Sequence, residues 1–579
     1  AAGSGKTKVL VERLFSYVER EGANLDDFLI ITYTRAAASE LRGKIAKALT
    51  ERMERDPGNY HLRQQMLRVY RADIKTVDAF CTALLRENCH LLGEDARGHA
   101  LRPDFRVLDE NEAQVLRERV LARTLDDFYD CLTTGSTLLA DTLGAGRDDS
   151  ALEDLVLELH AKLQAQPYED KWLEAQRAFW RAVPDKIENT PYGKILLNEV
   201  RRKARHCKNL LQRAAQEMCA NDALNQKYAP AFLDASYQLE ALEGKTAEGW
   251  DAARGVTIAF PRLAAVKDSD GGEMKARMKS LWDNCKETVK GFAEIFSASS
   301  DEAVEDLRTM APAMLALIDL TADFSRRYNE EKRRRNSADF SDQEHEAIRL
   351  LIGEDGAPTE LARIVSARYR EIMVDEYQDT NEVQNRIFDA ISCKGENLFT
   401  VGDVKQSIYR FRLADPRIFL QHYNTWPPLE DAEEHDSAKL LLSRNFRSRK
   451  EVLDATNFIF CNILSEEMGE LDYGADEMLR LGANYVESSA CGAEFHLLDL
   501  PTQTGEQRVR ASEAEAAFVA DYISDMLTSE FPIQDDKTKE LRPVREEDIV
   551  ILMRSPSTRL LDYRRALESR GLHCAAESD

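Results

Sequence analysis

Apolar and polar positions follow the same alternation near both ends of this chain. Residues 28–34 (FLIITYT) form a continuous apolar run, and Ala36 to Leu49 repeat apolar positions with helical spacing. The alternation returns at Tyr369, where the apolar runs of REIMVDEYQDT and NLFTVGD each end in acidic residues. Buried strands that alternate with amphipathic helices predict a parallel α/β sheet.

The middle of the chain has a different pattern. Residues 108–335 are rich in Leu, Ala, Glu, Arg and Lys at helical spacing, which predicts a helical insertion with a loop at 255–275. A third α/β stretch begins near Lys439 and includes an apolar run within Glu546–Ser555, which predicts another strand. The acidic, Pro-rich segment 425–436 predicts a domain boundary. The predicted parts are therefore a first α/β domain in 1–107 and 336–430, the insertion 108–335, and a second domain in 431–579.

Composition changes this picture only modestly. A chain of 579 residues is long enough for several domains. None of its ten cysteines forms a C-x-x-C pair, which argues against a zinc or iron–sulfur site and favours reduced core cysteines in the cytoplasm. The net charge of −25 argues only weakly against nucleic-acid binding, because phosphate contacts depend on local charge. No apolar run is long enough to predict a membrane span.

The first seven residues fit the end of a phosphate-binding loop, G-x-x-x-x-G-K-[ST]. Residues 1–4 fill the free positions, and Gly5, Lys6 and Thr7 complete the pattern. In such a loop, backbone N–H groups surround phosphate, the lysine reaches the β- and γ-phosphates, and the threonine holds Mg²⁺. The alternative is a Gly/Ser-rich loop before a helix. Because the first residue of the pattern is missing, we expect the chain to begin inside this site.

Two acidic residues, Asp375 and Glu376, follow the apolar run IMV. An acid at a strand end can hold Mg²⁺ through water, and its neighbour can polarise an attacking water. The alternative is a pair of solvated acids. A phosphate loop and an acidic strand end in one chain favour a nucleoside triphosphate site more strongly than either alone.

The segment VGDVKQSIYRFRLADP combines a strand end with a glutamine, aromatics and arginines. Gln406 is a candidate sensor of a γ-phosphate. Tyr409 and Phe411 are candidates for stacking on bases, and Arg410 and Arg412 for contacts with phosphates. By spacing alone, core aromatics and surface arginines are the favoured interpretation.

Two further stretches are locally basic. An arginine in LLLSRNFRSRK (440–450) could close on a γ-phosphate from a second domain, although the stretch equally fits a solvated helix start. The run RRYNEEKRRRN (326–336) could contact duplex DNA, but a solvated helix face is the favoured interpretation.

The order of GSGKT, TYTRAAASELR, TVDAFC, VDEYQDTN, VGDVKQSIYRFR and NFRS resembles motifs I, Ia, Ic, II, III and IV of the UvrD/Rep branch of superfamily 1 DNA helicases. Within that branch the chain is most similar to the AddA family of helicase–nuclease proteins. Three features carry this second resemblance: the long gap between motifs Ic and II, the stretch ADFSDQEHEAIRLL before motif II, and FRVLDENEA after motif Ic.

The resemblance implies an α/β fold of two RecA-like P-loop motor domains, the second incomplete, with the large helical insertion in the first. It implies ATP and Mg²⁺ as cofactors, with Thr7 and Asp375 as metal ligands. Glu376 would be the catalytic base, Gln406 would couple the γ-phosphate to DNA, and Arg447 would reach the γ-phosphate across the cleft. The other implied contacts are with ATP at Gly3, Ser4, Gly5, Lys6, Thr7 and Phe446, and with single-stranded DNA at Thr34, Arg35, Ala36, Thr76, Phe80, Tyr409, Phe411 and Arg412.

The chain departs from the family pattern at two positions and at its ends. Asp78 stands where many relatives have histidine, so we expect a structural hydrogen bond there instead of a DNA contact. Leu413 replaces the glycine of the pattern FRGA. Motifs V and VI, the adenine-selecting glutamine motif and a C-terminal nuclease domain are not found, so we expect the chain to be a fragment.

The function that the resemblance implies is an ATP-dependent 3′–5′ DNA helicase in the bacterial cytoplasm. It would resect double-strand breaks for recombinational repair, acting on single-stranded DNA and duplex ends beside an AddB-like partner. Two alternatives stay open: a UvrD-like repair helicase without a nuclease, and an ATP-binding DNA-binding module that does not unwind. The long insertion counts against the first, and the intact ATP-site residues count against the second.

Overall fold

The computed structural model divides the chain into two compact units. One comprises Ala1–Glu87 and Gln343–Asp579, and the other comprises Asn88–Asp342. Residues 1–2 of the loop pattern and 434–435 of the predicted boundary lie outside the described residues. The domain bounds predicted above stay predictions. The residues that the structure describes are 3–95, 97–143, 150–392, 395–433, 436–486, 492–500, 510–535 and 538–575.

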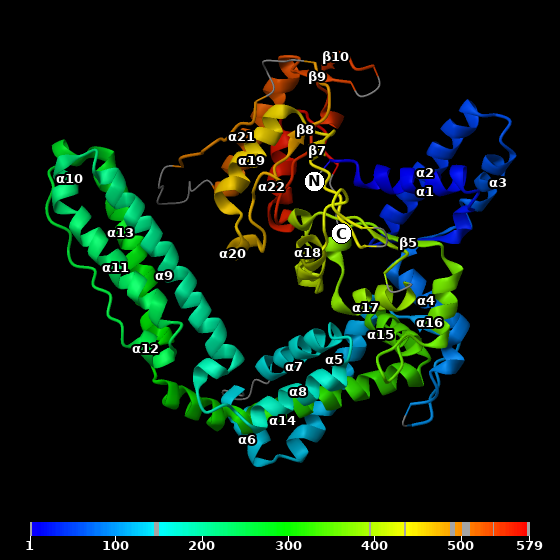
Figure 1. The fold of residues 1–579 in the computed structure, drawn as a ribbon, viewed down its shortest axis with the longest axis horizontal. Helices are drawn as coiled ribbons and strands as arrows, with labels where there is room; N and C mark the ends of the chain where they lie inside the picture. Colours follow the sequence, from blue (N-terminus) through cyan, green and yellow to red (C-terminus); the bar gives the residue numbers. More distant parts are fainter. Residues whose placement is uncertain are drawn as a thin grey trace. The chain divides into compact units, whose positions relative to one another are not determined.

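The first unit is organised around a parallel sheet (Figure 1). Because side chains alternate between the faces of a strand, Phe28 and Ile30 join one core while Leu29 and Ile31 are equally buried on the other face. The predicted α/β class with a parallel sheet is confirmed. The strands in spatial order are β2 (Asp73–Thr76), β1 (Phe28–Thr32), β5 (Glu371–Val374) and β6 (Leu398–Thr400).

Helices cover this sheet and position its carboxyl edge. The predicted helix after the first strand is confirmed and extends further than expected, to Arg55. Apolar side chains at helical spacing on α1, α2 and α3 pack against β1 in one core. The helices of this part are α1 (Lys6–Arg20), α2 (Arg35–Arg55), α3 (Tyr60–Arg68), α4 (Val77–Asn88), α15 (Phe340–Leu351), α16 (Glu360–Arg368), α17 (Glu382–Ile391) and α18 (Pro416–Thr425).

The rest of the first unit carries short strand pairs and helices. The strand predicted within Glu546–Ser555 is wrong: residues 546–548 form a 3₁₀ turn, and 549–553 pair with no described strand. A strand needs a neighbour for its backbone hydrogen bonds, and here Val550 and Leu552 are 76% and 90% exposed. The elements are β7 (Arg444–Asn445), α19 (Lys450–Ile463), α20 (Glu466–Gly469), β8 (Arg480–Leu481), α21 (Ala511–Thr528), β9 (Pro532–Gln534), β10 (Leu541–Pro543) and α22 (Pro556–Glu568).

In its described residues, the second unit is helical apart from one short strand pair. Its long helices α9, α11 and α13 run side by side and share a core (Figure 1). The loop predicted at 255–275 ends earlier than expected, because α13 begins at Asp268. The elements are β3 (Arg106–Val107), α5 (Glu110–Asp130), α6 (Thr134–Leu143), α7 (Ser150–Gln164), α8 (Glu169–Arg181), α9 (Pro191–Met218), α10 (Asp222–Lys227), α11 (Ala229–Lys245), α12 (Trp250–Arg254), α13 (Asp268–Ile295), α14 (Ser300–Arg334) and β4 (Ser337–Ala338).

Candidate nucleotide site and nucleic-acid interface

The phosphate loop has the backbone that anion binding requires. Gly5 precedes α1 with φ 83°, and no side chain caps the helix, so the first-turn N–H groups are available to an anion. Gly3 also has a positive φ, 63°. A Cβ at Gly3 would lie 2.6 Å from Asn445 Nδ2 and 2.9 Å from Arg447 Cβ. The loop is therefore packed tightly against the segment that carries Arg447.

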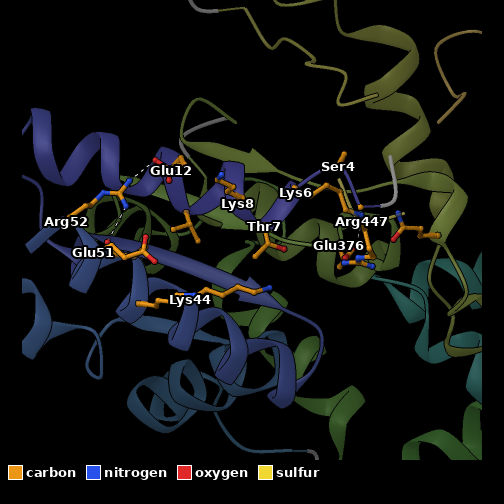
Figure 2. Close-up of a pocket in the computed structure, with 16 residues that line it drawn as sticks. Ser4, Lys6, Thr7, Lys8, Glu12, Lys44, Glu51, Arg52, Glu376 and Arg447 are labelled. Atoms are coloured by element: carbon orange, nitrogen blue, oxygen red, sulfur yellow. Dashed lines mark hydrogen bonds and ion pairs between the residues drawn. The ribbon is translucent and has the colours of Figure 1, made fainter. Parts of the chain in front are cut away.

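A cavity of about 480 Å³ opens over this loop. Figure 2 shows Ser4, Lys6, Glu376 and Arg447 close together at one end of it. The sequence predicted this grouping from segments far apart in the chain. The cavity is lined by Gly3, Ser4, Gly5, Lys6, Thr7, Lys8, Val11, Glu12, Lys44, Lys47, Ala48, Glu51, Arg52, Glu376, Gln406 and Arg447.

The two acids after β5 contact the loop directly. Glu376 Oε2 accepts from Lys6 Nζ at 2.8 Å, and Asp375 Oδ2 accepts from the Thr7 hydroxyl at 3.4 Å. Burial and then the charge of Glu376 raise the pKa of Asp375, whereas Lys6 lowers it. Glu376 has a left-handed backbone, φ 52°, which few non-glycine residues adopt.

Several cations in the cavity have no carboxylate partner within the described part of the chain. Lys8, Lys47 and Arg447 form no ion pair there, while Arg52 pairs with Glu12 at 2.6 Å. Together with Lys6 and the free N–H groups of α1, these cations suit the charge of a triphosphate. The hydroxyl of Thr7 beside the Asp375 carboxylate offers the oxygen ligands that Mg²⁺ prefers. The residues present therefore fit a nucleoside triphosphate with its metal.

Gln406 is the cavity residue contributed by the segment after β6. Its Nε2 donates to Asp403 Oδ2 at 2.8 Å, and Lys405 Nζ lies 2.8 Å from the same carboxylate. Lys405 lowers the pKa of Asp403 although burial opposes it. The buried Asp403 thus fixes the glutamine at the rim of the nucleotide cavity.

Tyr409 and Arg412 of this segment line a second cavity, of about 150 Å³. Arg412 lies over the rings of Tyr409 and Phe411, at 5.4 and 5.5 Å from their centres, and Phe411 is 76% exposed. The core position that spacing favoured for Phe411 is therefore wrong. This second cavity is lined by Tyr33, Thr34, Val77, Asp78, Asp379, Asn381, Gln384, Tyr409, Arg412 and Ala414.

Most of the predicted single-strand contacts are accessible. Thr34, Arg35 and Ala36 are exposed at the start of α2, where the Thr34 hydroxyl caps the helix. Thr76 and Phe80 are 7% and 5% exposed, so the structure does not bring their side chains to this surface. Their role as DNA contacts stays a prediction.

Asp78 and Phe446 lie close to these cavities. Burial raises the pKa of Asp78, while the charge of Arg35 lowers it. The backbone N–H of Phe446 donates to the Gly3 carbonyl at 2.9 Å, and its side chain is 55% exposed. An adenine contact by this ring stays a prediction.

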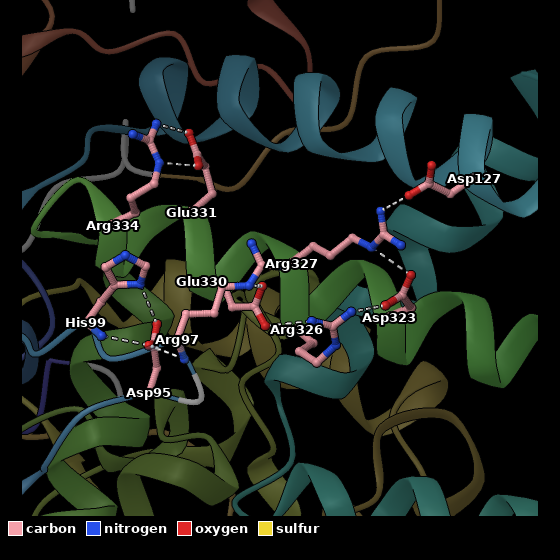
Figure 3. A network of polar contacts seen from close by, with 10 residues as sticks. All are labelled: Asp95, Arg97, His99, Asp127, Asp323, Arg326, Arg327, Glu330, Glu331 and Arg334. Carbon is pink, nitrogen blue, oxygen red and sulfur yellow. Dashed lines mark hydrogen bonds and ion pairs between the residues drawn. The ribbon is translucent and has the colours of Figure 1, made fainter.

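The basic run 326–336 is neutralised by acidic neighbours on α14 and α5 (Figure 3). Arg326 pairs with Asp323 and Glu330, and Arg327 pairs with Asp127 and Asp323. Arg334 and Arg335 share one acid of their own helix, Glu331. These ion pairs support the interpretation as a solvated helix face for the arginines, whereas Tyr328 and Lys332 of the same run are buried.

Sequence reasoning missed several residues at these sites. Gln378 is 1% exposed and bonds to Glu376, although it belongs to the same stretch DEYQDT. Lys8 follows Thr7 directly, and Lys44 and Lys47 lie on the helix after the first strand. Their positions next to recognised motifs were the available signal. Among the residues that the structure describes, no helix is long and apolar enough to cross a membrane.

Comparison with known proteins agrees with this geometry. A model of the UvrD/REP helicase N-terminal domain matches residues 1–427. The chain is also similar to the ATP-dependent helicase/nuclease A-subunits of three bacteria, and 96% of the chain is matched each time. The identities are 33% in Ruminiclostridium cellulolyticum, 34% in Acetivibrio thermocellus and 33% in Listeria innocua, over 47%, 47% and 46% of those proteins.

The chain therefore spans about half the length of the curated relatives it matches. The resemblance predicted from the motif order is confirmed. Because the family model covers most of its residues, this chain belongs to the UvrD/Rep helicase family.

Proposed function

We propose that the protein containing this chain is an ATP-dependent 3′–5′ DNA helicase of the AddA type, which resects double-strand breaks for recombinational repair. The observation that carries the proposal is one cavity lined by the phosphate loop, Glu376, Gln406 and Arg447. The relatives are named as the A-subunits of helicase/nucleases, and these names support the finer assignment.

The roles proposed for the chain's residues follow from their contacts. Lys6 and Arg447 bind phosphate oxygens, and Thr7 and Asp375 hold Mg²⁺. When bound, Mg²⁺ neutralises charge on the phosphate oxygens. Glu376 accepts the proton of the attacking water, and its left-handed backbone keeps the carboxylate at the cavity wall.

Single-stranded DNA is the ligand that we propose for the surface around Tyr409, Phe411 and Arg412. Tyr409 and Phe411 present aromatic faces, and Arg412 beside them presents a charge to the phosphates. Stacking tolerates any base, so these contacts suit movement along a strand without sequence preference. Thr34, Arg35 and Ala36 extend the proposed track along the carboxyl edge of the sheet.

The proposal also covers the partner protein, the cellular compartment, the DNA substrate and the nuclease activity. The partner would be an AddB-like protein, the compartment would be the bacterial cytoplasm, and duplex ends would be the entry point for DNA. Nuclease activity would come from residues outside this chain, because the relatives that carry nuclease in their names are about twice as long.

The test uses the full-length native protein with its natural partner on linear duplex DNA with ATP and Mg²⁺. Strand separation and nucleotide release are followed together. Glu376→Gln should lower ATP hydrolysis by about 100-fold or more and abolish both signals, because it removes the proton acceptor. The matched control is Glu360→Gln, at an exposed position on α16 with no place in either cavity.

Each other outcome assigns a different function. Strand separation without nucleotide release would identify a UvrD-like helicase and overturn the nuclease assignment. ATP-dependent DNA binding with no strand separation would overturn the helicase assignment in favour of a binding module.

A further inference from the structure

Gln378 joins the two halves of the nucleotide site with a single side chain. It lies in the 3₁₀ turn after β5 and is 1% exposed. Its Nε2 donates to Glu376 Oε2 at 2.9 Å, and its Oε1 accepts from the backbone N–H of Asp403 at 2.8 Å. One end of the amide therefore contacts the proposed base, and the other contacts the segment that begins after β6.

The surroundings fix the orientation of this amide. Only one assignment of its oxygen and nitrogen satisfies both partners, because a carboxylate accepts and an N–H donates. A Cβ at Gly402 would lie 2.7 Å from Gln378 Oε1, so only glycine leaves room for this approach. The Ser407 hydroxyl donates to the main-chain carbonyl of Gln378 at 3.4 Å, which anchors the backbone of the same residue. The side chain is thus clamped between two loops.

The contacts continue on both sides without a gap. On one side, Glu376 bonds to Lys6 of the phosphate loop at 2.8 Å. On the other, the Asp403 carboxylate accepts from Gln406 at 2.8 Å, three residues before Tyr409. A shift of the segment 403–412 must therefore move the Asp403 N–H, and with it the amide that holds Glu376.

We infer that Gln378 is a positioning residue that makes ATP hydrolysis at Glu376 depend on DNA contact at Tyr409–Arg412. This inference rests on the proposed function, since it assigns a role within that site. When the segment holds a strand, the amide presents Glu376 in its productive orientation. Without Gln378, the carboxylate loses its neutral donor, and the buried N–H of Asp403 loses its acceptor.

The experiment measures ATP hydrolysis by the full-length protein with its partner, with and without an oligothymidine strand. In Gln378→Met the ratio of DNA-stimulated to basal hydrolysis should fall about tenfold, and the KM for ATP should change by less than about threefold. The matched control is Gln65→Met. Gln65 is 0% exposed and also bridges two groups, Asn24 Oδ1 and the Leu25 N–H, and it lines neither cavity. Its substitution should leave the ratio unchanged.

A second variant covers the case in which Gln378→Met does not fold. Gln378→Glu keeps the shape and the acceptor for Asp403 but has no donor for Glu376, so the ratio should fall here too. The inference is overturned if basal and stimulated rates fall equally, or if the folded variants keep the wild-type ratio. Wild-type protein without DNA-stimulated hydrolysis would overturn the proposed function, and this inference with it.

Discussion

At the scale of single residues, two of the six described non-glycine residues with a positive φ belong to the segments of the candidate sites. Glu376 and Leu413 have φ 52° and 66°. Contacts hold Glu376: its N–H donates to Asp375 Oδ1 at 3.0 Å, and its carboxylate meets Lys6. Leu413 ends the 3₁₀ turn after Arg412. The related pattern FRGA has glycine at this position, and the positive φ gives the physical reason.

A substitution at Gly3 tests whether the tight packing at the phosphate loop matters for ATP binding. Gly3→Ala should lower ATP affinity by at least about tenfold, because its Cβ would meet Asn445 and Arg447 in addition to the strain of φ 63°. A titration with a fluorescent ATP analogue measures this. Gly22→Ala is the matched control, since Gly22 has φ 68° but open space around its Cβ position. Equal losses in both variants would show that backbone strain, and not the contact, is responsible.

Glu344 gives the fold a pH dependence. Burial raises its pKa to about 7, while bonds from Gln384 and Asn381 partly oppose this shift. The folded pKa lies above the ordinary value of 4.5, so the cost of ionising the buried carboxyl appears as pH rises from 4.5 through 7. Glu344→Gln should therefore stabilise the first unit by roughly 2 kcal/mol at pH 8 and have little effect near pH 4.5.

Thermal melting across this pH range measures the effect of Glu344→Gln. The matched control is again Glu360→Gln, an exposed glutamate on the neighbouring helix α16. A stabilisation that is as large at pH 4.5 as at pH 8 would contradict the titration argument.

At the scale of elements, a buried ion cluster within the second unit links the end of α14 to the turn that follows it. Lys332 is 1% exposed and contacts Asp339 at 2.9 Å and Asp342 at 2.6 Å. Lys332→Met should destabilise this junction by about 3–5 kcal/mol at pH 8, because two buried carboxylates lose their cation. The loss should be smaller at pH 5, since burial and the charge of Asp339 raise the pKa of Asp342 to about 7.

Chemical denaturation of Lys332→Met checks this junction. Replacing both aspartates by asparagine in the same variant should restore most of the lost stability, because no uncompensated charge remains. Lys290→Met, on the exposed side of α13, is the control for loss of a lysine. An unchanged unfolding midpoint for Lys332→Met would refute the proposed strength of the cluster.

Elements with strong local patterns were predictable from the sequence, and those that depend on distant partners were not. The runs that became β1, β5 and β6 are apolar and end in residues of the site, so their positions were predicted closely. The run at 549–553 has the same composition but pairs with no described strand. Apolar composition did not predict burial there, since Val550 and Leu552 are exposed, and a strand also requires a neighbour that no local pattern identifies.

The residues of the candidate site also fall into two groups, those predictable from a local motif and those that depend on a distant partner. Lys6, Asp375 and Glu376 stand in motifs whose residue types point to phosphate and metal, and the structure brings them together. Gln378 could not be assigned from the sequence, because its role depends on Asp403 arriving from another strand. The exposure of Phe411 could not be predicted from the sequence either, because i, i+2 spacing does not distinguish a core aromatic residue from a surface one.

At the scale of the whole molecule, charge is distributed unevenly. The chain carries a net charge of −25, yet six lysines and arginines line one cavity against only three glutamates. Attraction of an anion falls off within about 10 Å at ordinary salt, so these local cations outweigh the distant acids. The overall charge therefore says little about whether such a protein handles nucleotides.

The strand order also has a consequence for how the protein is made. β1 pairs with β5 as well as with β2, but the ribosome must add every residue from Val77 to Arg370 before β5 exists. At about 5–20 residues per second, this takes on the order of 15 to 60 seconds. During that interval the buried run FLIIT has an unpaired edge, the kind of surface that aggregates. Synthesis of this parallel sheet therefore includes a delay between β1 and β5. We expect chaperones that hold unfolded chains to bind the nascent chain during this delay.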